Sequence, residues 1–90
     1  MDPWYVYIVH CRDNSLYTGI TKDLEQRILE HNSGPKGARY TRSRRPVALV
    51  YHEQVASRSA ATSRECHIKK LTTTSKRQLV AQTLQPGPHS

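Results

Sequence analysis

The chain has 90 residues, 36% of them hydrophobic, which is enough to build one small domain and too little for two. Fourteen lysines and arginines against seven acidic residues give a net charge of +7, so nucleic acids are the first partners to consider, although a basic surface also serves solubility. Two isolated cysteines, Cys11 and Cys66, exclude a disulfide framework and a four-cysteine zinc site, and the short apolar runs exclude a membrane span. We therefore expect a reduced, cytoplasmic protein.

The first twenty residues predict a β-hairpin. Residues 4–11 are aromatic and β-branched, which is typical of a central strand that is covered on both faces. Residues 12–15 carry short polar side chains that bond to their own backbone and tolerate left-handed dihedrals. Strand character resumes over residues 16–20, so the turn joins two antiparallel strands.

The middle of the chain predicts a helix, a loop and a third strand. The spacing becomes helical over residues 21–32, where Thr21 or Asp23 is suited to cap the first turn. Residues 33–45 contain a cluster of breakers and five basic side chains, which indicates an exposed basic loop. Residues 46–53 are again β-like, with a proline at the first position.

The last third of the chain predicts two helices and a tail. Residues 57–72 have helical spacing and begin with the possible caps Ser57 and Ser59, and Ser75 is suited to cap a short helix that ends at Ala81. The resulting order is β-β-α-β-α-α, an α+β domain over residues 1–82. Residues 83–90 have no apolar periodicity, and we expect a disordered tail.

Polar side chains interrupt the apolar face of each long helix. Leu24, Arg27, Ile28 and His31 share one face of the first helix. Arg27 either extends to solvent or faces a cleft that receives an anion, and His31 either finishes the helix end or acts as a base. In the second helix Glu65 falls on the inward stripe, where its carboxylate needs a cation, either Arg27 or a divalent metal.

Two tyrosines are predicted to share a surface of the sheet. Alternation places Tyr5 and Tyr7 on one face of the first strand, and Tyr17 shares a face of the second strand with Gly19. A glycine there leaves room for a close approach by a ligand or by backbone, so a cleft floored by tyrosines is one interpretation. Plain packing of aromatic side chains in a sheet is the other.

These residues together resemble the motifs of the GIY-YIG nuclease family. Tyr5-Val6-Tyr7 is followed, after nine residues, by Tyr17-Thr18-Gly19, then by Arg27, His31 and a later glutamate. The segments 36–41 and 65–71 resemble more narrowly its small single-domain, YhbQ-like (UPF0213) branch. The order and spacing of the motifs agree with the strands and helices predicted above, which makes coincidence a poor explanation.

The resemblance implies a three-stranded antiparallel sheet flanked by helices, with a shallow cationic active site. The residues that match catalytic positions of the family are Tyr7, Tyr17, Arg27, His31 and Glu65. Glu65 is then the ligand of one Mg²⁺ or Mn²⁺ ion, Arg27 offsets negative charge, and either Tyr17 or His31 activates water. Gly19 matches the motif glycine.

The sequence departs from the family pattern at several positions. Tyr5 replaces the first glycine of the motif, Thr18 replaces an isoleucine, and Ile20 stands where repair-type members have lysine. The polar residue that follows the glutamate in those relatives is matched here only by Lys69, Lys70 or Arg77.

Three functions remain open from the sequence. The first is an endonuclease or exonuclease that acts on DNA in preference to RNA, in DNA repair or processing. Its basic residues would bind phosphates: Arg39, Arg42, Arg44, Arg45, Lys69 and Lys70. The second is a nucleic-acid-binding module that has lost catalysis, as the absence of the lysine at Ile20 favours. The third is a docking domain for an acidic protein, although no obligate protein partner is evident.

Overall fold

The computed structural model describes residues 3–33 and 35–84. Its elements are β1 (Trp4–His10), β2 (Leu16–Thr21), α1 (Leu24–Asn32), α2 (Arg39–Arg42), β3 (Ala48–Val55), α3 (Arg58–Lys69) and α4 (Thr73–Leu84). The three strands form one antiparallel sheet in the order β2-β1-β3. The predicted α+β fold is confirmed, with the short helix α2 as an addition.

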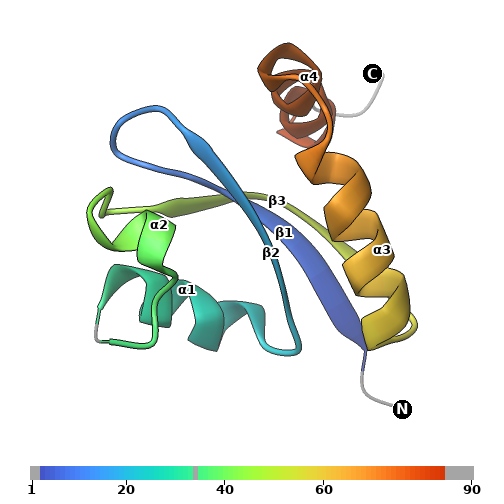
Figure 1. The fold of residues 1–90 in the computed structure, drawn as a ribbon, viewed down its shortest axis with the longest axis horizontal. Helices are drawn as coiled ribbons and strands as arrows, with labels where there is room; N and C mark the ends of the chain where they lie inside the picture. Colours follow the sequence, from blue (N-terminus) through green and yellow to red (C-terminus); the bar gives the residue numbers. More distant parts are fainter. Residues whose placement is uncertain (1–2, 34, 85–90) are drawn as a thin grey trace.

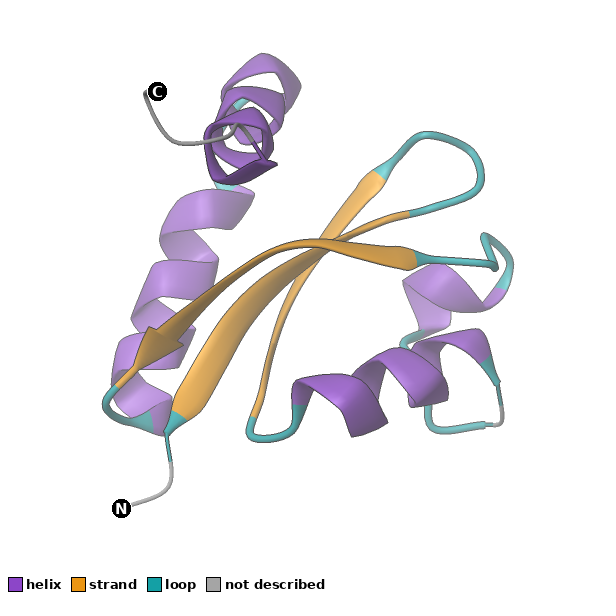
Figure 2. Ribbon diagram, turned by 180° about the vertical axis from the view of Figure 1, so that it is seen from behind, coloured by secondary structure: helices purple, strands orange, loops and turns teal. Residues whose placement is uncertain are grey.

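The sheet lies between two layers of helices. Figure 1 shows α1 and α2 on one side of the sheet and α3 and α4 on the other, and the reverse view in Figure 2 shows the same separation. β1 is the middle strand, as its uninterrupted apolar sequence predicts. No helix in the described ranges is long and apolar enough to cross a membrane.

Each face of β1 contributes to a separate core. One face buries Val6 and Ile8 against Tyr51 of β3 and against Ala61 and Ile68 of α3. The opposite face carries a second cluster of Tyr7, Val9, Cys11 and Val47, against which Leu24 and Ile28 of α1 pack. The predicted alternation along β1 is therefore confirmed. Both cysteines are free; Cys11 is buried, whereas Cys66 is exposed and does not act as a buried apolar residue.

Local side-chain bonds form the turns and helix starts that the sequence predicts. Asp13 accepts hydrogen bonds from the backbone and hydroxyl of Ser15, and Asn14 adopts a left-handed φ of 70° in the hairpin turn. Asp23 caps α1 by accepting from the backbone N–H of Gln26 at 3.1 Å. Ser57 caps α3 in the same way.

The last helix differs from its prediction. Thr72, and not Ser75, caps α4, because the hydroxyl of Thr72 accepts the backbone N–H of Ser75 at 3.1 Å. The helix begins at Thr73 and continues to Leu84, past the predicted end at Ala81. The expected tail over residues 83–90 thus begins within α4, and residues 85–90 lie outside the described residues.

The third strand begins two residues later than predicted. The side chain of Asn32 bonds to both backbone polar groups of Val47, with its amide donating to the carbonyl at 2.9 Å and its oxygen accepting the N–H at 2.7 Å. Because Val47 has no free backbone groups, ladder pairing starts at Ala48, opposite His10. The sequence pattern does not contain this long-range bond.

The segment expected to be an open basic loop is partly ordered as α2. Its first turn has no side-chain cap, and instead the hydroxyl of Thr41 donates to the carbonyl of Ala38 at 3.0 Å. Thr41 is fully buried. A buried side chain holds this turn in place, so its basic composition was a poor guide to its structure.

An ion pair joins α3 to the sheet. Two guanidinium nitrogens of Arg64 donate to the two carboxylate oxygens of Glu53 on β3, at 2.9 and 3.0 Å, and the Tyr51 hydroxyl donates to the same carboxylate. Burial by itself raises the pKa of Glu53, but the bonds from Arg64 and Tyr51 outweigh it and hold the pKa below its usual value. Because Arg64 directly precedes Glu65, this ion pair holds α3 against the sheet next to Glu65.

Gly19 is required by the close approach of Tyr7. The two residues are directly paired across β1 and β2, and a Cβ atom at position 19 would lie 2.5 Å from the Tyr7 hydroxyl and 2.7 Å from its Cζ. The space above the glycine, expected to admit a ligand or backbone, is filled by this tyrosine ring.

We predict that Gly19→Ala lowers the free energy of unfolding by about 1 to 3 kcal/mol, because the added methyl group displaces the buried Tyr7 ring. Chemical denaturation of the variant beside wild type measures this. Gln54→Ala, at an exposed position of β3, is the control and should change stability by less than about 0.5 kcal/mol. Equal stability of Gly19→Ala and wild type would contradict the assigned contact.

Candidate active site

The five residues predicted to be catalytic come from four elements and face a common region of the fold. Tyr7 lies on β1, Tyr17 on β2, Arg27 and His31 on α1, and Glu65 on α3. Their side chains interact with one another. The charges of Arg27 and Glu65 both act on the Tyr7 hydroxyl, and the His31 ring contacts both tyrosine rings. Residues separated by up to 58 positions in the chain are thus brought together.

His31 is buried in the middle of this group. Its Nε2 lies 2.7 Å from the Tyr7 hydroxyl, and its Nδ1 lies 2.8 Å from the Thr41 hydroxyl. Its ring also meets the rings of Tyr7 and Tyr17 edge-on, at centroid distances of 5.7 and 5.4 Å. Both nitrogens have partners and the side chain is inaccessible to solvent. His31 therefore contacts a bound substrate only through its neighbours.

Burial shifts both members of the Tyr7–His31 pair toward their neutral forms. Desolvation raises the pKa of Tyr7 from 10.0 to about 12, despite an opposing hydrogen bond from Arg27. Desolvation, together with the charges of Arg27 and Arg45, lowers the pKa of His31 from 6.5 to about 4. The proton they share consequently stays on Tyr7 at neutral pH, and His31 is a neutral imidazole.

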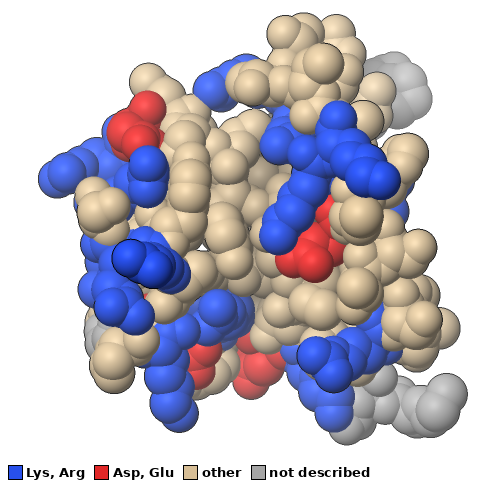
Figure 3. All heavy atoms as spheres, viewed as in Figure 1, with Lys and Arg blue, Asp and Glu red and all other residues tan. Residues whose placement is uncertain are grey.

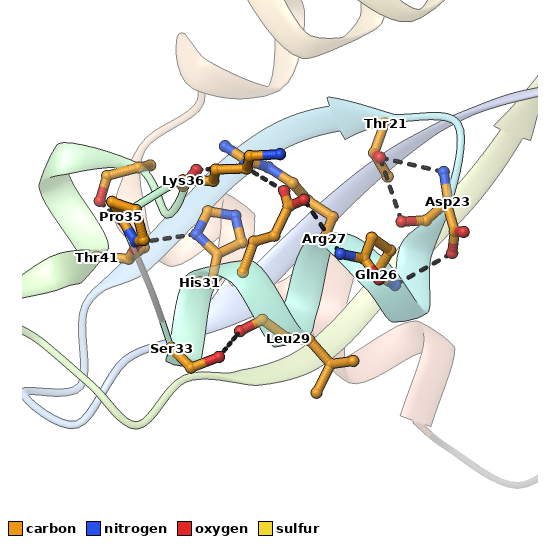
Figure 4. A network of polar contacts seen from close by, with 12 residues as sticks. Thr21, Asp23, Gln26, Arg27, Leu29, His31, Ser33, Pro35, Lys36 and Thr41 are labelled. Carbon is orange, nitrogen blue, oxygen red and sulfur yellow. Dashed lines mark hydrogen bonds and ion pairs between the residues drawn. The ribbon is translucent and has the colours of Figure 1, made fainter.

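Arg27 faces the site from α1. One nitrogen donates to Glu30 at 2.9 Å and to the backbone carbonyl of Lys36 at 2.7 Å. Figure 4 shows Arg27 beside Lys36, and the charge of the guanidinium acts on the nearby Tyr7 hydroxyl. Its side chain is 24% exposed, so part of the guanidinium remains accessible. The side chain is thus held against the protein by Glu30 and Lys36 and does not extend freely to solvent.

Glu65 forms an ion pair with Lys69, which the sequence analysis did not predict as its partner. Its Oε2 lies 3.4 Å from Lys69, one turn further along α3, and its side chain is 20% exposed. The expected pairing with Arg27 is wrong, because Arg27 bonds to Glu30. The i,i+4 spacing of Glu65 and Lys69 was the available signal.

A divalent ion at Glu65 would have this one carboxylate as its protein ligand. Within residues 3–33 and 35–84 there is no cluster of three or more side chains of the types that ligate metals. Mg²⁺ is commonly held by one or two carboxylates, with water and substrate phosphate completing its shell. A partly exposed carboxylate in a basic site fits that mode of binding and does not fit a closed structural site.

Tyr17 belongs to a column of aromatic and cationic groups. Its ring stacks on Tyr40 at a centroid distance of 5.7 Å, and Lys69 lies 6.0 Å from the Tyr17 centroid. The Arg44 guanidinium lies 4.0 Å from the Tyr40 ring. Tyr17 remains partly exposed, in contrast to Tyr7. Its hydroxyl is therefore the more accessible of the two.

The basic residues predicted to bind phosphate have different surroundings. The guanidinium of Arg45 donates to the carbonyls of His31 and Glu30 at the end of α1, and Arg44 pairs with Asp13 at 2.9 Å. Arg42 bonds to a loop carbonyl and is exposed, and Arg39, Lys69 and Lys70 are also exposed. Arg39 and Arg42 thus remain better placed for phosphate than Arg45 does.

Basic side chains flank the site on two sides. Figure 3 shows lysine and arginine atoms over the region of α1 and α2 and again where α3 meets α4, with a band of uncharged atoms between them. β2 passes through this band in the matching view of Figure 1. In this view β2 therefore passes between two groups of basic side chains.

Three residues around the site were not predicted to contribute to it. Tyr40 stacks on Tyr17, Thr41 bonds to His31, and Glu30 bonds to Arg27. Tyr40 carried a signal, as the only large apolar residue of a basic segment. Thr41 carried none, because its importance depends on a contact with α1.

Comparison with known proteins supports the family resemblance that the sequence motifs indicate. The sequence matches the GIY-YIG catalytic domain over residues 3–78. It is 62% identical over 77 residues to the UPF0213 protein DP2720 of Desulfotalea psychrophila, covering 86% of this chain and 70% of the relative. It is 50% identical over 82 residues to the UPF0213 protein SSP2268 of Staphylococcus saprophyticus, covering 91% and 99% of the two chains.

Two solution NMR structures have a similar fold. One is the UPF0213 protein BH0048 from Bacillus halodurans, with a TM-score of 0.57 and 45% identity, covering 97% of this chain and 89% of that one. The other is EF2693 from E. faecalis, with a TM-score of 0.59 and 33% identity, covering 100% and 96%. The matched domain, the motif positions and the common fold agree, and the chain belongs to the GIY-YIG nuclease-type family, in its UPF0213 branch.

Proposed function

We propose that the chain is a metal-dependent nuclease that hydrolyses phosphodiester bonds of DNA. The observation that carries this proposal is the arrangement of Tyr17, Arg27 and Glu65, which come from three elements and are all partly exposed around the buried Tyr7–His31 pair. The basic surfaces on both sides favour a polyanionic substrate. Family membership supports the reaction class.

Each exposed residue has a role in this chemistry that follows from its environment. Glu65 holds the ion, which when bound polarises the scissile phosphate and offsets the charge of the leaving oxygen. Arg27 remains cationic and partly exposed, so that it stabilises negative charge on the phosphate oxygens. Lys69 lies between Glu65 and Tyr17 and is free to move to a phosphate when the carboxylate binds metal.

Tyr17 is a better candidate than His31 for the group that orients or deprotonates the attacking water. His31 is fully buried, and its low pKa of about 4 makes it a weak proton acceptor. Moving the proton from Tyr7, with its pKa of about 12, to His31 would be strongly uphill. Tyr17 has an accessible hydroxyl with cationic Lys69 near its ring. The buried pair then serves to position the others.

A second function is a nucleic-acid-binding module without catalysis. Two observations favour it: Lys69 already occupies one oxygen of Glu65, and Ile20 packs against the Val6–Ile8 cluster where repair-type members carry a lysine. On this alternative the basic surfaces bind phosphates and the carboxylate serves only its ion pair.

The first experiment compares wild type with Glu65→Gln on labelled single-stranded, duplex and branched DNA, and on RNA, with Mg²⁺, Mn²⁺ or EDTA. We predict that Glu65→Gln lowers metal-dependent cleavage about 100-fold or more, because metal stabilisation amounts to several kcal/mol and about 1.4 kcal/mol is a factor of ten. DNA affinity should be retained, since binding depends on many phosphate contacts.

Glu25→Gln removes a carboxylate from an exposed position of α1 and should leave cleavage unchanged. Tyr17→Phe, run alongside, should also lose cleavage. Unchanged cleavage in Glu65→Gln would exclude this glutamate as the metal ligand. Binding without cleavage by wild type under every condition would instead establish the non-catalytic module.

The pH dependence of stability tests the neutral state of His31. Because the pKa falls from 6.5 in the unfolded chain to about 4 in the fold, the unfolded state alone takes up a proton between these values. We predict that the free energy of unfolding falls by about 2 kcal/mol from pH 7 to pH 5.

The measurement is chemical denaturation across this pH range for wild type, His31→Gln and His52→Gln. His31→Gln should flatten the dependence, whereas His52→Gln, at an exposed position of β3, should preserve it. A wild-type stability that does not change between pH 7 and pH 5 would show that His31 is not held neutral.

The salt dependence of DNA binding tests the basic surface near α2. We predict that Arg39→Ala weakens binding several-fold and reduces the slope of log affinity against log salt by about one, the effect of losing one phosphate contact. Lys22→Ala removes the same charge from the far end of β2 and serves as the control. Equal effects of the two substitutions would mean that only net charge matters.

A further inference from the structure

A continuous chain of polar contacts runs from the candidate site into α2. It starts at the hydroxyl of Tyr7, on which the charge of Arg27 acts, passes through the ring of His31, and reaches the hydroxyl of Thr41 and the carbonyl of Ala38. The three inner distances are 2.7, 2.8 and 3.0 Å. Figure 4 shows His31 between Arg27 and Thr41, with its contact to Thr41 drawn.

The direction of these hydrogen bonds is fixed at the Tyr7 end. The charge of the neighbouring Arg27 guanidinium acts on the Tyr7 hydroxyl, and a guanidinium has no acceptor for the Tyr7 proton. The Tyr7 hydroxyl proton therefore needs its own acceptor, and Tyr7 is 1% exposed, so water is excluded. Among the described residues, Nε2 of His31 is the acceptor within reach. Nε2 must then carry no proton.

The other end of the chain completes this arrangement. A neutral His31 with a bare Nε2 carries its proton on Nδ1, which donates to the oxygen of Thr41. The single proton of Thr41 then goes to the Ala38 carbonyl, which also accepts the backbone N–H groups that begin α2. The donors of Tyr7, His31 and Thr41 each have an acceptor only when the hydrogen bonds run in this direction.

We propose that Thr41 is a positioning residue that fixes the Nδ1–H tautomer of His31 and, through Tyr7, leaves the lone pairs of the Tyr7 oxygen facing the positive charge of Arg27. No group in contact with substrate is assigned to Thr41 itself. Its hydroxyl acts by accepting the Nδ1 proton, which leaves Nε2 to accept from Tyr7. The effect on catalysis rests on the proposed nuclease function, whereas the tautomer does not.

The direction of these hydrogen bonds decides which part of the Tyr7 hydroxyl faces Arg27. If Thr41 donated to His31, the ring would carry its proton on Nε2 and would donate to the Tyr7 oxygen. The phenolic proton would then have to point toward Arg27, where two positively polarised donors would meet. Arg27 would then face the Tyr7 proton in place of an oxygen lone pair, while its bonds to Glu30 and the Lys36 carbonyl would remain.

The tautomer is measured directly by long-range ¹H–¹⁵N NMR of the histidine rings in the intact, metal-free chain near pH 7. We expect His31 of wild type and of Thr41→Ser, which keeps the hydroxyl, to be in the Nδ1–H form. Thr41→Val has nearly the same shape and no acceptor, so it should shift His31 to the Nε2–H form or to a mixture. His52, exposed on β3, is the internal reference and should not change.

Wild-type His31 in the Nε2–H or the charged form would overturn the proposal, as would an unchanged tautomer in Thr41→Val. If Thr41→Val does not fold, the wild-type and Thr41→Ser spectra decide alone. In a cleavage assay, Thr41→Val should lower kcat about 10- to 100-fold with a smaller change in KM, and Thr41→Ser should restore it. Absence of cleavage by wild type would overturn the nuclease function and leave the tautomer result standing.

Discussion

The hydrogen bond between Tyr7 and His31 connects the central strand to α1, the helix that carries two of the five candidate catalytic residues. It is buried, it spans 24 positions of the chain, and it requires a glycine on the neighbouring strand so that the tyrosine ring fits. A buried hydroxyl and imidazole are costly without partners, and together they satisfy each other. Position and orientation of α1 against the sheet, and with them Arg27, depend on this contact.

The candidate site has a buried part, which positions the neighbouring side chains, and a partly exposed part, which is available to a ligand. Tyr7, His31 and Thr41 are inaccessible and neutral, whereas Arg27 and Glu65 retain charge and partial exposure. This division follows from the dielectric environment: burial favours neutral forms, and charges persist where solvent or a counter-ion is near. A buried neutral network holds its geometry without titrating over the physiological range.

The two helical layers contribute unequal kinds of support. α1 and α2 hold the tyrosines through direct side-chain contacts, including Tyr40 stacked on Tyr17. α3 is held to the sheet by the pair between Arg64 and Glu53, and Glu65 is the next residue along that helix. Glu65 is thereby held by the helical layer that lies across the sheet from α1 and α2. A change in either layer therefore alters the geometry between Tyr17, the candidate base, and Glu65, the candidate metal ligand.

Much of this protein was readable from local patterns in the chain, because alternation, helical spacing and capping act over a few residues. They predicted the order of the strands and of the three longer helices, the middle strand, and pairs of candidate caps that included Asp23 and Ser57. The motif residues were grouped by the family resemblance. Only the tertiary structure decided which groups are partners. The start of β3 depends on Asn32, the α2 turn on Thr41, and the state of His31 on its burial against the sheet and α2. Those properties come from contacts between distant segments, whose energies depend on the desolvation and distance that folding creates.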